Sequence, residues 1–224
     1  MLKIAGLNQY YGQSHCLRDL DLGVPEGQCT VLMGRNGVGK TTLLQSIMGL
    51  LPARTGQMAF ADTDLLKQSA ERRASLGIGY VPQGRQVFPL LTVEENLRIG
   101  LPARRDGLKQ VPGFIFELFP VLKEMLNRRG GDLSGGQQQQ LAIGRALVVD
   151  PKLLILDEPT EGIQPNVVGE IGDILRRLNR EQGLTLLLVE QKLPFARKLG
   201  DRFALMDRGR AVAAGPMAEL GDEL

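Results

Sequence analysis

The sequence predicts an α/β fold in which a parallel core sheet is flanked by helices. The first observation is a glycine-rich loop, residues 34–41, which follows a predicted strand at Gln28–Met33 and precedes a predicted helix at Thr41–Leu50. The second is a pair of strand-and-helix units whose strands, Lys152–Leu156 and Leu184–Val189, are continuous apolar runs. Such strands are typical of a parallel sheet that is buried on both faces.

The other elements of the predicted core follow from the same patterns. Turn residues such as Gly12 and Pro25 separate short apolar runs before the glycine loop, and the two late strands are each followed by an amphipathic stretch. The additional predicted strands are Leu2–Leu7, Cys16–Leu22, Gly56–Phe60, Ile78–Val81, Arg202–Met206 and Ala211–Ala214. The helices predicted after the two late strands are Pro165–Asn179 and Leu193–Leu199.

The pattern changes between Gln83 and about Asp132. Apolar residues there recur at helical spacing, with turns at residues 100–102 and 112–113. A further helix is predicted at Gln137–Val149. This part of the chain is therefore predicted to be a mostly helical insert between two strands of the core.

The composition restricts the class of protein. Hydrophobic residues make up 43% of the 224 residues, which is enough for a globular core, and the net charge of +2 gives no support for nucleic-acid binding. No apolar run approaches the roughly 18 residues of a membrane helix, and the start lacks the segments of a signal peptide. We expect a cytosolic protein with at most a peripheral membrane role, in which Cys16 and Cys29 are reduced thiols.

The glycine loop fits G-x-x-x-x-G-K-[ST], the pattern of a phosphate-binding loop. Its glycines let backbone N–H groups surround a β-phosphate, and the N-terminus of the following helix points at the same oxygens. Lys40 would lie between the β- and γ-phosphates, Thr41 would bind Mg²⁺, and Thr42 would reach the α-phosphate. The predicted nucleotide-binding residues of this segment are Gly34, Arg35, Asn36, Gly37, Val38, Gly39, Lys40, Thr41 and Thr42.

Two acidic residues follow the apolar strand at 152–156. Asp157 is expected to emerge at the carboxyl edge of the sheet beside the phosphate loop, where it can hold Mg²⁺. Glu158 comes next and points elsewhere, so it is placed to polarise a water for attack on the γ-phosphate. Gln83, which follows the strand at 78–81, is a third candidate, with its amide oxygen on Mg²⁺ or on the water.

The pentapeptide Leu133-Ser134-Gly135-Gly136-Gln137 predicts a second anion-binding surface. Its serine is a helix cap, and the two glycines expose backbone N–H groups at the start of the helix.

Taken together, the phosphate loop, this pentapeptide and the apolar run ending in Asp157-Glu158 resemble the ATP-binding cassette family. The resemblance implies a single phosphate-loop ATPase domain, 1–224, with an N-terminal antiparallel β subdomain. Residues 1–82 and 150–224 would form its core, and 83–149 the mainly helical subdomain. It also implies that ATP and Mg²⁺ are bound and that two chains hydrolyse ATP together as a head-to-tail dimer.

The resemblance assigns further residues. Tyr11, directly before Gly12, would stack on adenine, and Gln83 would act as a catalytic and Mg²⁺-linking residue. The residues that would contact the ATP of the partner subunit are Ser134, Gly135, Gly136 and Gln137.

Two positions depart from the family pattern. Gln164 stands where many members have an aspartate, and Gln191 stands where most have a histidine that contacts the γ-phosphate. His15, the only histidine, precedes the phosphate loop and cannot take that role. Because glutamine donates a hydrogen bond but does not ionise, we expect Glu158 to be the base and Gln191 to position groups.

The Glu190-Gln191 pair is similar to that of ATPases in the branched-chain amino-acid and urea uptake family. Three stretches, 7–15, 133–141 and 158–165, resemble the urea members, so urea is the expected cargo and a branched-chain amino acid or short-chain amide the alternative. The resemblance implies a second ATPase subunit, two permease subunits and a periplasmic binding protein, at the cytoplasmic face of a bacterial inner membrane. Residues 88–91 would contact a permease or pack within the insert.

A competing class is the soluble cassette ATPase of DNA repair or chromosome architecture. Such proteins insert long coiled coils before the pentapeptide, whereas the interval here is short and lacks sustained heptads. Translation-associated cassettes carry two such domains in one chain, and a small-molecule kinase has no need of the pentapeptide. No nucleic-acid partner is therefore expected.

Overall fold

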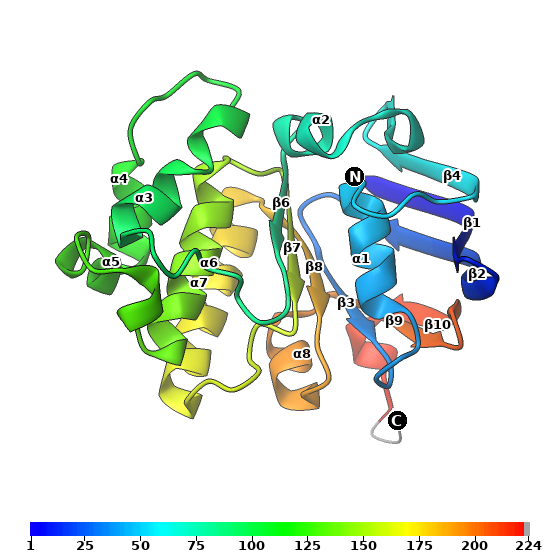
Figure 1. Ribbon diagram of the computed structural model, residues 1–224. Helices are drawn as coiled ribbons and strands as arrows, with labels where there is room; N and C mark the ends of the chain where they lie inside the picture. Colours follow the sequence, from blue (N-terminus) through cyan, green and yellow to red (C-terminus); the bar gives the residue numbers. More distant parts are fainter. Residues whose placement is uncertain (222–224) are drawn as a thin grey trace.

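The computed structural model describes residues 1–221, and positions 222–224 of the predicted domain lie outside the described residues. Its core is a six-stranded sheet in the order β10-β9-β3-β8-β7-β6 (Figure 1). Neighbouring strands are parallel except for β10, which pairs antiparallel with β9 at one edge. The strands are β3 (Cys29–Met33), β6 (Ile78–Val81), β7 (Leu153–Asp157), β8 (Thr185–Val189), β9 (Arg202–Asp207) and β10 (Arg210–Pro216).

The core sheet is buried on both faces, as its apolar strands predict. Along β7, Leu153 and Ile155 pack with helix α1 (Lys40–Met48) and the N-terminal sheet. Leu154 and Leu156 instead pack with the helices of the opposite face, because successive side chains of a strand point to opposite sides. Each face therefore carries its own hydrophobic core.

The N-terminal sheet has the order β2-β1-β4-β5 and is antiparallel throughout. Its strands are β1 (Leu2–Tyr11), β2 (Ser14–Val24), β4 (Thr55–Phe60) and β5 (Thr63–Asp64). Helix α1 shares its hydrophobic cluster, and Figure 1 shows this helix between the blue N-terminal sheet and the core sheet. The sheet thus covers the helix that begins at the phosphate loop.

The segment between β6 and β7 is helical and lies to one side of the core sheet (Figure 1). A methyl group at Gly144 would meet Leu97, Ile115 and Leu122 at 3.2–3.5 Å, so this glycine lets the neighbouring helices approach α6 closely. The helices here are α3 (Val93–Arg98), α4 (Gly113–Leu118), α5 (Pro120–Glu124) and α6 (Gly135–Val148).

The remaining helices complete the coverage of the core. They are α2 (Ala70–Ser75), α7 (Pro165–Gln182) and α8 (Leu193–Leu199), with short 3-10 turns at Leu65–Lys67, Leu101–Ala103, Gly130–Asp132 and Met217–Glu219. Within residues 1–221, no helix combines the length and the apolar character needed to cross a membrane.

The predicted strands are present, with ends that differ by a few residues. Helix α6 begins at Gly135, not at the expected Gln137, because Ser134 and Gln137 form a capping box that starts the helix within the glycines. Helix α2 and strand β5 were not predicted from the sequence, since six and two residues are too short to show a period.

Candidate nucleotide-hydrolysis site

The phosphate loop lies between β3 and α1 and is closely packed from behind. Gly34 has a φ of 147°, and a methyl group there would lie 2.5 Å from the carbonyl oxygen of Met206. Gly39 has a φ of 109°, and its methyl group would lie 3.0 Å from Leu17. Only glycine fits both positions, so the loop is held in one conformation by the strands behind it.

This loop presents unpaired hydrogen-bond donors. Within residues 1–221, the backbone N–H groups from Val38 to Thr42 have no acceptor, and no side chain caps the start of α1. The Lys40 ammonium donates to the carbonyls of Gly34 at 2.8 Å and Arg35 at 3.0 Å. Free N–H groups at a helix N-terminus together with a buried ammonium fit a polyphosphate anion.

Thr41 and Asp157 form the oxygen pair that the sequence predicts for Mg²⁺. The Thr41 hydroxyl donates to Asp157 Oδ2 at 3.0 Å. Burial raises the pKa of Asp157 to about 6, the Thr41 hydrogen bond opposes this shift, and the charge of Glu158 adds to it. No group of three or more His, Cys, Asp or Glu side chains in the described part of the chain could hold a metal. Mg²⁺ commonly binds one carboxylate together with substrate phosphates, so this pair fits it.

Glu158 leaves β7 in an unusual conformation. Its φ is +48°, which is uncommon for a residue with a side chain, and its N–H donates to Val189 O at 3.0 Å. The turn directs its carboxylate to the phosphate loop, where Oε1 lies 3.8 Å from Lys40 Nζ. The carboxylate is 14% exposed and accordingly remains accessible from the loop side.

Two glutamine amides hold this carboxylate. Gln191 Nε2 donates to Glu158 Oε1 and to Asn36 Oδ1, the latter at 2.8 Å. Gln83 Nε2 donates to Glu158 Oε2 at 3.3 Å. Of the three predicted catalytic residues, Gln83 and Gln191 therefore both bind Glu158, and Glu158 and Gln191 contact the phosphate loop.

Two further acidic residues of the site were not identified from the sequence. Glu161 Oε2 accepts from Gln83 Nε2 at 2.9 Å. The buried Glu190 accepts from the backbone N–H groups of Gln191 and Lys192 and from the Thr160 hydroxyl at 2.8 Å, so it orders the loop that carries Gln191. The sequence does contain a signal for Glu190, because this residue directly follows the last apolar residue of a buried strand. Glu158 lies in a similar position, two residues after the last apolar residue of its strand.

Tyr11 lies at the end of β1 with its ring 49% exposed, and its hydroxyl is 3.5 Å from Thr42 Oγ1. The neighbouring Tyr10 instead stacks on His15, with ring centroids 4.1 Å apart. Cys16, a free thiol as the sequence predicts, donates to Thr42 Oγ1 at 3.3 Å and lines the hollow over the phosphate loop. The free aromatic face beside the loop is therefore that of Tyr11.

The pentapeptide forms a separate surface. Ser134 Oγ accepts from the N–H of Gln137 at 3.4 Å, and Gln137 Oε1 accepts from the N–H of Ser134 at 2.9 Å. Within residues 1–221, no hydrogen bond or ion pair joins Ser134–Gln137 to the phosphate loop. Within residues 1–221, one chain thus presents two helix N-termini, those of α1 and α6, that no hydrogen bond or ion pair joins.

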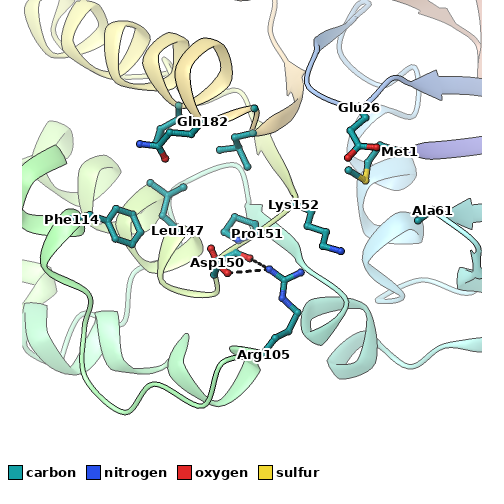
Figure 2. A pocket seen from close by; sticks show the side chains of 13 residues that line it. Met1, Glu26, Ala61, Arg105, Phe114, Leu147, Asp150, Pro151, Lys152 and Gln182 are labelled. Atoms are coloured by element: carbon teal, nitrogen blue, oxygen red, sulfur yellow. Dashed lines mark hydrogen bonds and ion pairs between the residues drawn. The ribbon is translucent and has the colours of Figure 1, made fainter.

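Another hollow lies at the opposite edge of the core sheet, beside the residues that precede β3, β7 and β8 (Figure 2). Figure 2 shows Phe114 and Leu147 of the helical segment facing it, together with Glu26 and Lys152. Arg105 closes one wall by donating to Asp150 O at 2.6 Å and to Asp150 Oδ2 at 3.1 Å. None of the predicted site residues lines this hollow.

Three features define the phosphate-loop class of nucleoside triphosphatases here. They are the phosphate loop, the carboxylates at the end of β7 and the capped N-terminus of α6. A model of the ABC transporter family matches residues 17–161. The chain belongs to this family, and the fold class expected from the resemblance is confirmed.

Relatives and solved structures agree with this assignment. The chain is 41% identical to a high-affinity branched-chain amino acid transport ATP-binding protein, BraG, of Pseudomonas aeruginosa, over 95% of this chain and 91% of that one. It is 37% identical to a probable branched-chain amino acid transport ATP-binding protein, LivF, of Archaeoglobus fulgidus, over 98% and 94%. A dimeric ATP-binding cassette in a post-hydrolysis state with ADP and Pi has a TM-score of 0.87 at 25% identity, over 97% and 99%.

Proposed function

We propose that the chain is the ATP-hydrolysing subunit that powers a bacterial importer, with a branched-chain amino acid as the cargo. The observation that carries the ATPase assignment is the contact of Lys40, Glu158 and Gln191 around a phosphate loop with free N–H donors. The cargo is supported by the names of the two relatives, at 41% and 37% identity.

The proposed binding step uses residues that are already in place. The N–H groups of Val38 to Thr42 donate to phosphate oxygens, and the Lys40 ammonium turns from the loop carbonyls to the phosphates. Tyr11 stacks on the adenine. When bound, Mg²⁺ neutralises charge on the phosphate oxygens, and Thr41, Asp157 and Gln83 are its proposed ligands.

The proposed hydrolytic step centres on Glu158. Its carboxylate accepts a hydrogen bond from the attacking water and takes up the proton as the water oxygen bonds to the γ-phosphorus. The bond between the γ-phosphorus and the β–γ bridging oxygen breaks in the same step, and ADP and inorganic phosphate are the products. Gln191 and Gln83 donate to the two oxygens of this carboxylate and therefore hold its plane. A neutral amide at 191 keeps this role unchanged across the pH range in which a histidine would titrate.

We propose that the site is completed by a second chain. The capped N-terminus of α6, with Ser134, Gly135, Gly136 and Gln137, has no hydrogen bond to the chain's own phosphate loop within residues 1–221, and the N–H groups of its two glycines would donate to the γ-phosphate on a partner. This arrangement divides the domain into a core, 1–82 and 150–224, and a helical subdomain, 83–149, that carries the partner-facing surface.

The helical subdomain also carries the proposed permease contact. Phe88 and Leu90 are 46% and 78% exposed, and Arg145 of α6 lies over the Phe88 ring at 5.2 Å. Such exposure favours docking over internal packing for these two side chains. The complex would contain a second ATPase subunit, two permeases and a periplasmic binding protein, with this chain at the cytoplasmic face of the inner membrane.

The ATPase proposal is tested by Mg²⁺-dependent phosphate release. We expect Glu158→Gln to lower kcat by about 10²–10⁴-fold, the range that general-base catalysis contributes, while ATP binding persists. Glu181→Gln on the exposed face of α7 makes the same chemical change and serves as the control. Equal activity of the two variants would contradict the proposal.

Urea, which the sequence comparison of three short stretches favours, is the second candidate cargo. The names of the two relatives support the alternative better. Nitrogen-limited growth of a deletion strain separates the candidates, since loss of growth on low leucine, isoleucine or valine supports our proposal. Loss of growth on low urea alone would contradict it.

A further inference from the structure

Arg85 lies two residues after Gln83 in a strained turn that follows β6. Gly84, Arg85 and Gln86 have φ values of +75°, +67° and +45°, so three successive residues are in the left-handed region. For the two residues with side chains, this conformation is strained and persists only where surrounding contacts hold it.

The guanidinium of Arg85 joins two parts of the chain that belong to different surfaces. Its Nη2 donates to the carbonyls of Glu161 at 3.3 Å and Gly162 at 3.1 Å, in the loop that follows β7. Its Nη1 donates to Gln138 Oε1 on α6 at 3.5 Å. Gln138 in turn donates to Gly130 O at 3.1 Å. One planar group thus bridges the loop at residues 158–164, called the hydrolytic loop below, and the first turn of α6.

Two glycines make room for this group. A methyl group at Gly135 would lie 3.1–3.3 Å from the guanidinium of Arg85, and one at Gly162 would lie 3.3 Å from its Nη2. Both distances are shorter than ordinary contact, so a side chain at either position would displace the guanidinium. Gly135 therefore serves the contact with Arg85 as well as exposing its own N–H.

The same turn holds the hydrolytic loop twice. Gln83 donates to the Glu161 carboxylate at 2.9 Å, while Arg85 holds the carbonyls of Glu161 and Gly162. From the other side, Arg145 of α6 donates to Gln86 O at 2.8 Å. A short chain of hydrogen bonds consequently connects Gln83 to α6.

We propose that Arg85 is a positioning residue for hydrolysis, which couples the loop beside Glu158 to the N-terminus of α6. The bridge sets the distance between the chain's own hydrolytic carboxylate and the surface that it presents to the ATP of its partner. This inference deepens the proposed function and rests on it. Loss of the bridge affects turnover in the paired state and leaves ATP binding by the phosphate loop intact.

The test compares Arg85→Ala with Arg98→Ala in the ATPase assay. Arg98 lies on α3 with a 60% exposed side chain, so its loss removes the same charge without breaking the bridge. We expect Arg85→Ala to lower kcat by about 3- to 30-fold, as coupling residues do, with KM for ATP within about twofold of the wild type. The control variant is expected to keep both constants.

Gln138→Ala and the double variant with Arg85→Ala supply a second measurement, the coupling between the two losses in kcat. A merely structural role of Arg85 would not give this coupling. Because Arg85 and Gln138 act in one bridge, the double variant is expected to lose no more kcat than Arg85→Ala alone. Should Arg85→Ala fail to fold, Arg85→Lys, which keeps the charge without the planar fork, takes its place in the same cycle.

The outcomes separate the two proposals. A wild type without Mg²⁺-dependent ATP hydrolysis contradicts the proposed function. If the wild type is active, three results contradict the role of Arg85. They are an unchanged kcat in Arg85→Ala, a rise in KM alone in that variant, and losses in kcat that multiply in the double variant.

Discussion

Replacement of Asp157 by asparagine is expected to stabilise the nucleotide-free protein. Asp157 is 2% exposed, and burial raises its pKa from an ordinary 3.8 to about 6. The ionised carboxylate is therefore unfavourable in the folded state above pH 6. The pKa shift corresponds to about 3 kcal/mol at most, and because asparagine still accepts from Thr41, we expect a gain of about 1–3 kcal/mol at pH 7.5.

The pH dependence of this gain follows from the sign of the shift. Between pH 3.8 and about 6 the folded protein binds more protons at this carboxyl than the unfolded chain does, so the penalty grows as the pH rises through that window. Above pH 6 the penalty is complete. The difference in stability between Asp157→Asn and wild type should accordingly shrink when the pH is lowered from 7.5 to 5.

Chemical denaturation of both proteins at pH 7.5 and pH 5 measures the two differences, with Asp62→Asn in the exposed turn after β4 as the control. Addition of Mg²⁺ and ATP is expected to reverse the order. At a ligand concentration of 1,000 times Kd the wild type gains about 4.1 kcal/mol, which exceeds the variant's expected advantage, whereas the variant lacks a metal ligand. A variant less stable than wild type without nucleotide, or a difference independent of pH, would refute the reasoning.

Three further predictions concern other parts of the site and its support. Cys16 lines the phosphate-loop hollow, whereas Cys29 is fully buried with its pKa raised to about 12, so a thiol reagent should modify Cys16 alone. ATP at 100 times Kd should slow the modification of Cys16 about 100-fold, as followed by mass spectrometry. Equal labelling with and without ATP would contradict the site. Gln191→Ala should lower kcat without removing an ionisation near pH 6.5 from its pH profile, and disappearance of such an ionisation would contradict the positioning role. Asn96 is fully buried, and its side chain makes four hydrogen bonds to residues 88–92. Asn96→Ala should therefore lower the free energy of unfolding, measured by denaturant titration, by about 2–4 kcal/mol. A loss below about 1 kcal/mol would show that these bonds do not order the segment.

The parts of the site that follow local rules could be predicted from the sequence. The phosphate loop follows from the spacing of its glycines, lysine and threonine, and Asp157 ends a strand whose apolar run shows that it is buried. A serine cap followed by a glutamine at the third helical position likewise marks the start of α6. In each case neighbours in the chain determine the structure.

The parts that depend on distant neighbours could not be predicted. Glu161 meets Gln83 across 78 positions of the chain, and Cys16 meets Thr42 across 26. Arg85 has its role only because Gly135 and Gly162 leave space for it, and none of these distances is visible in a single sequence. Helix α2 was missed for a related reason, since its buried Arg73 bonds to the carbonyls of Ser46 and Ile47 at the end of α1.

We propose that ATP is hydrolysed only where the phosphate loop of one chain meets the N-terminus of α6 of another. Ser134→Arg tests it most directly, because within residues 1–221 Ser134 makes no hydrogen bond with the chain's own phosphate loop. With the partner ATPase present, the variant is expected to bind ATP with wild-type affinity and to lose at least about 100-fold in kcat, the scale for losing an anion-binding donor at a reacting centre. Unimpaired hydrolysis by this variant would contradict the claim.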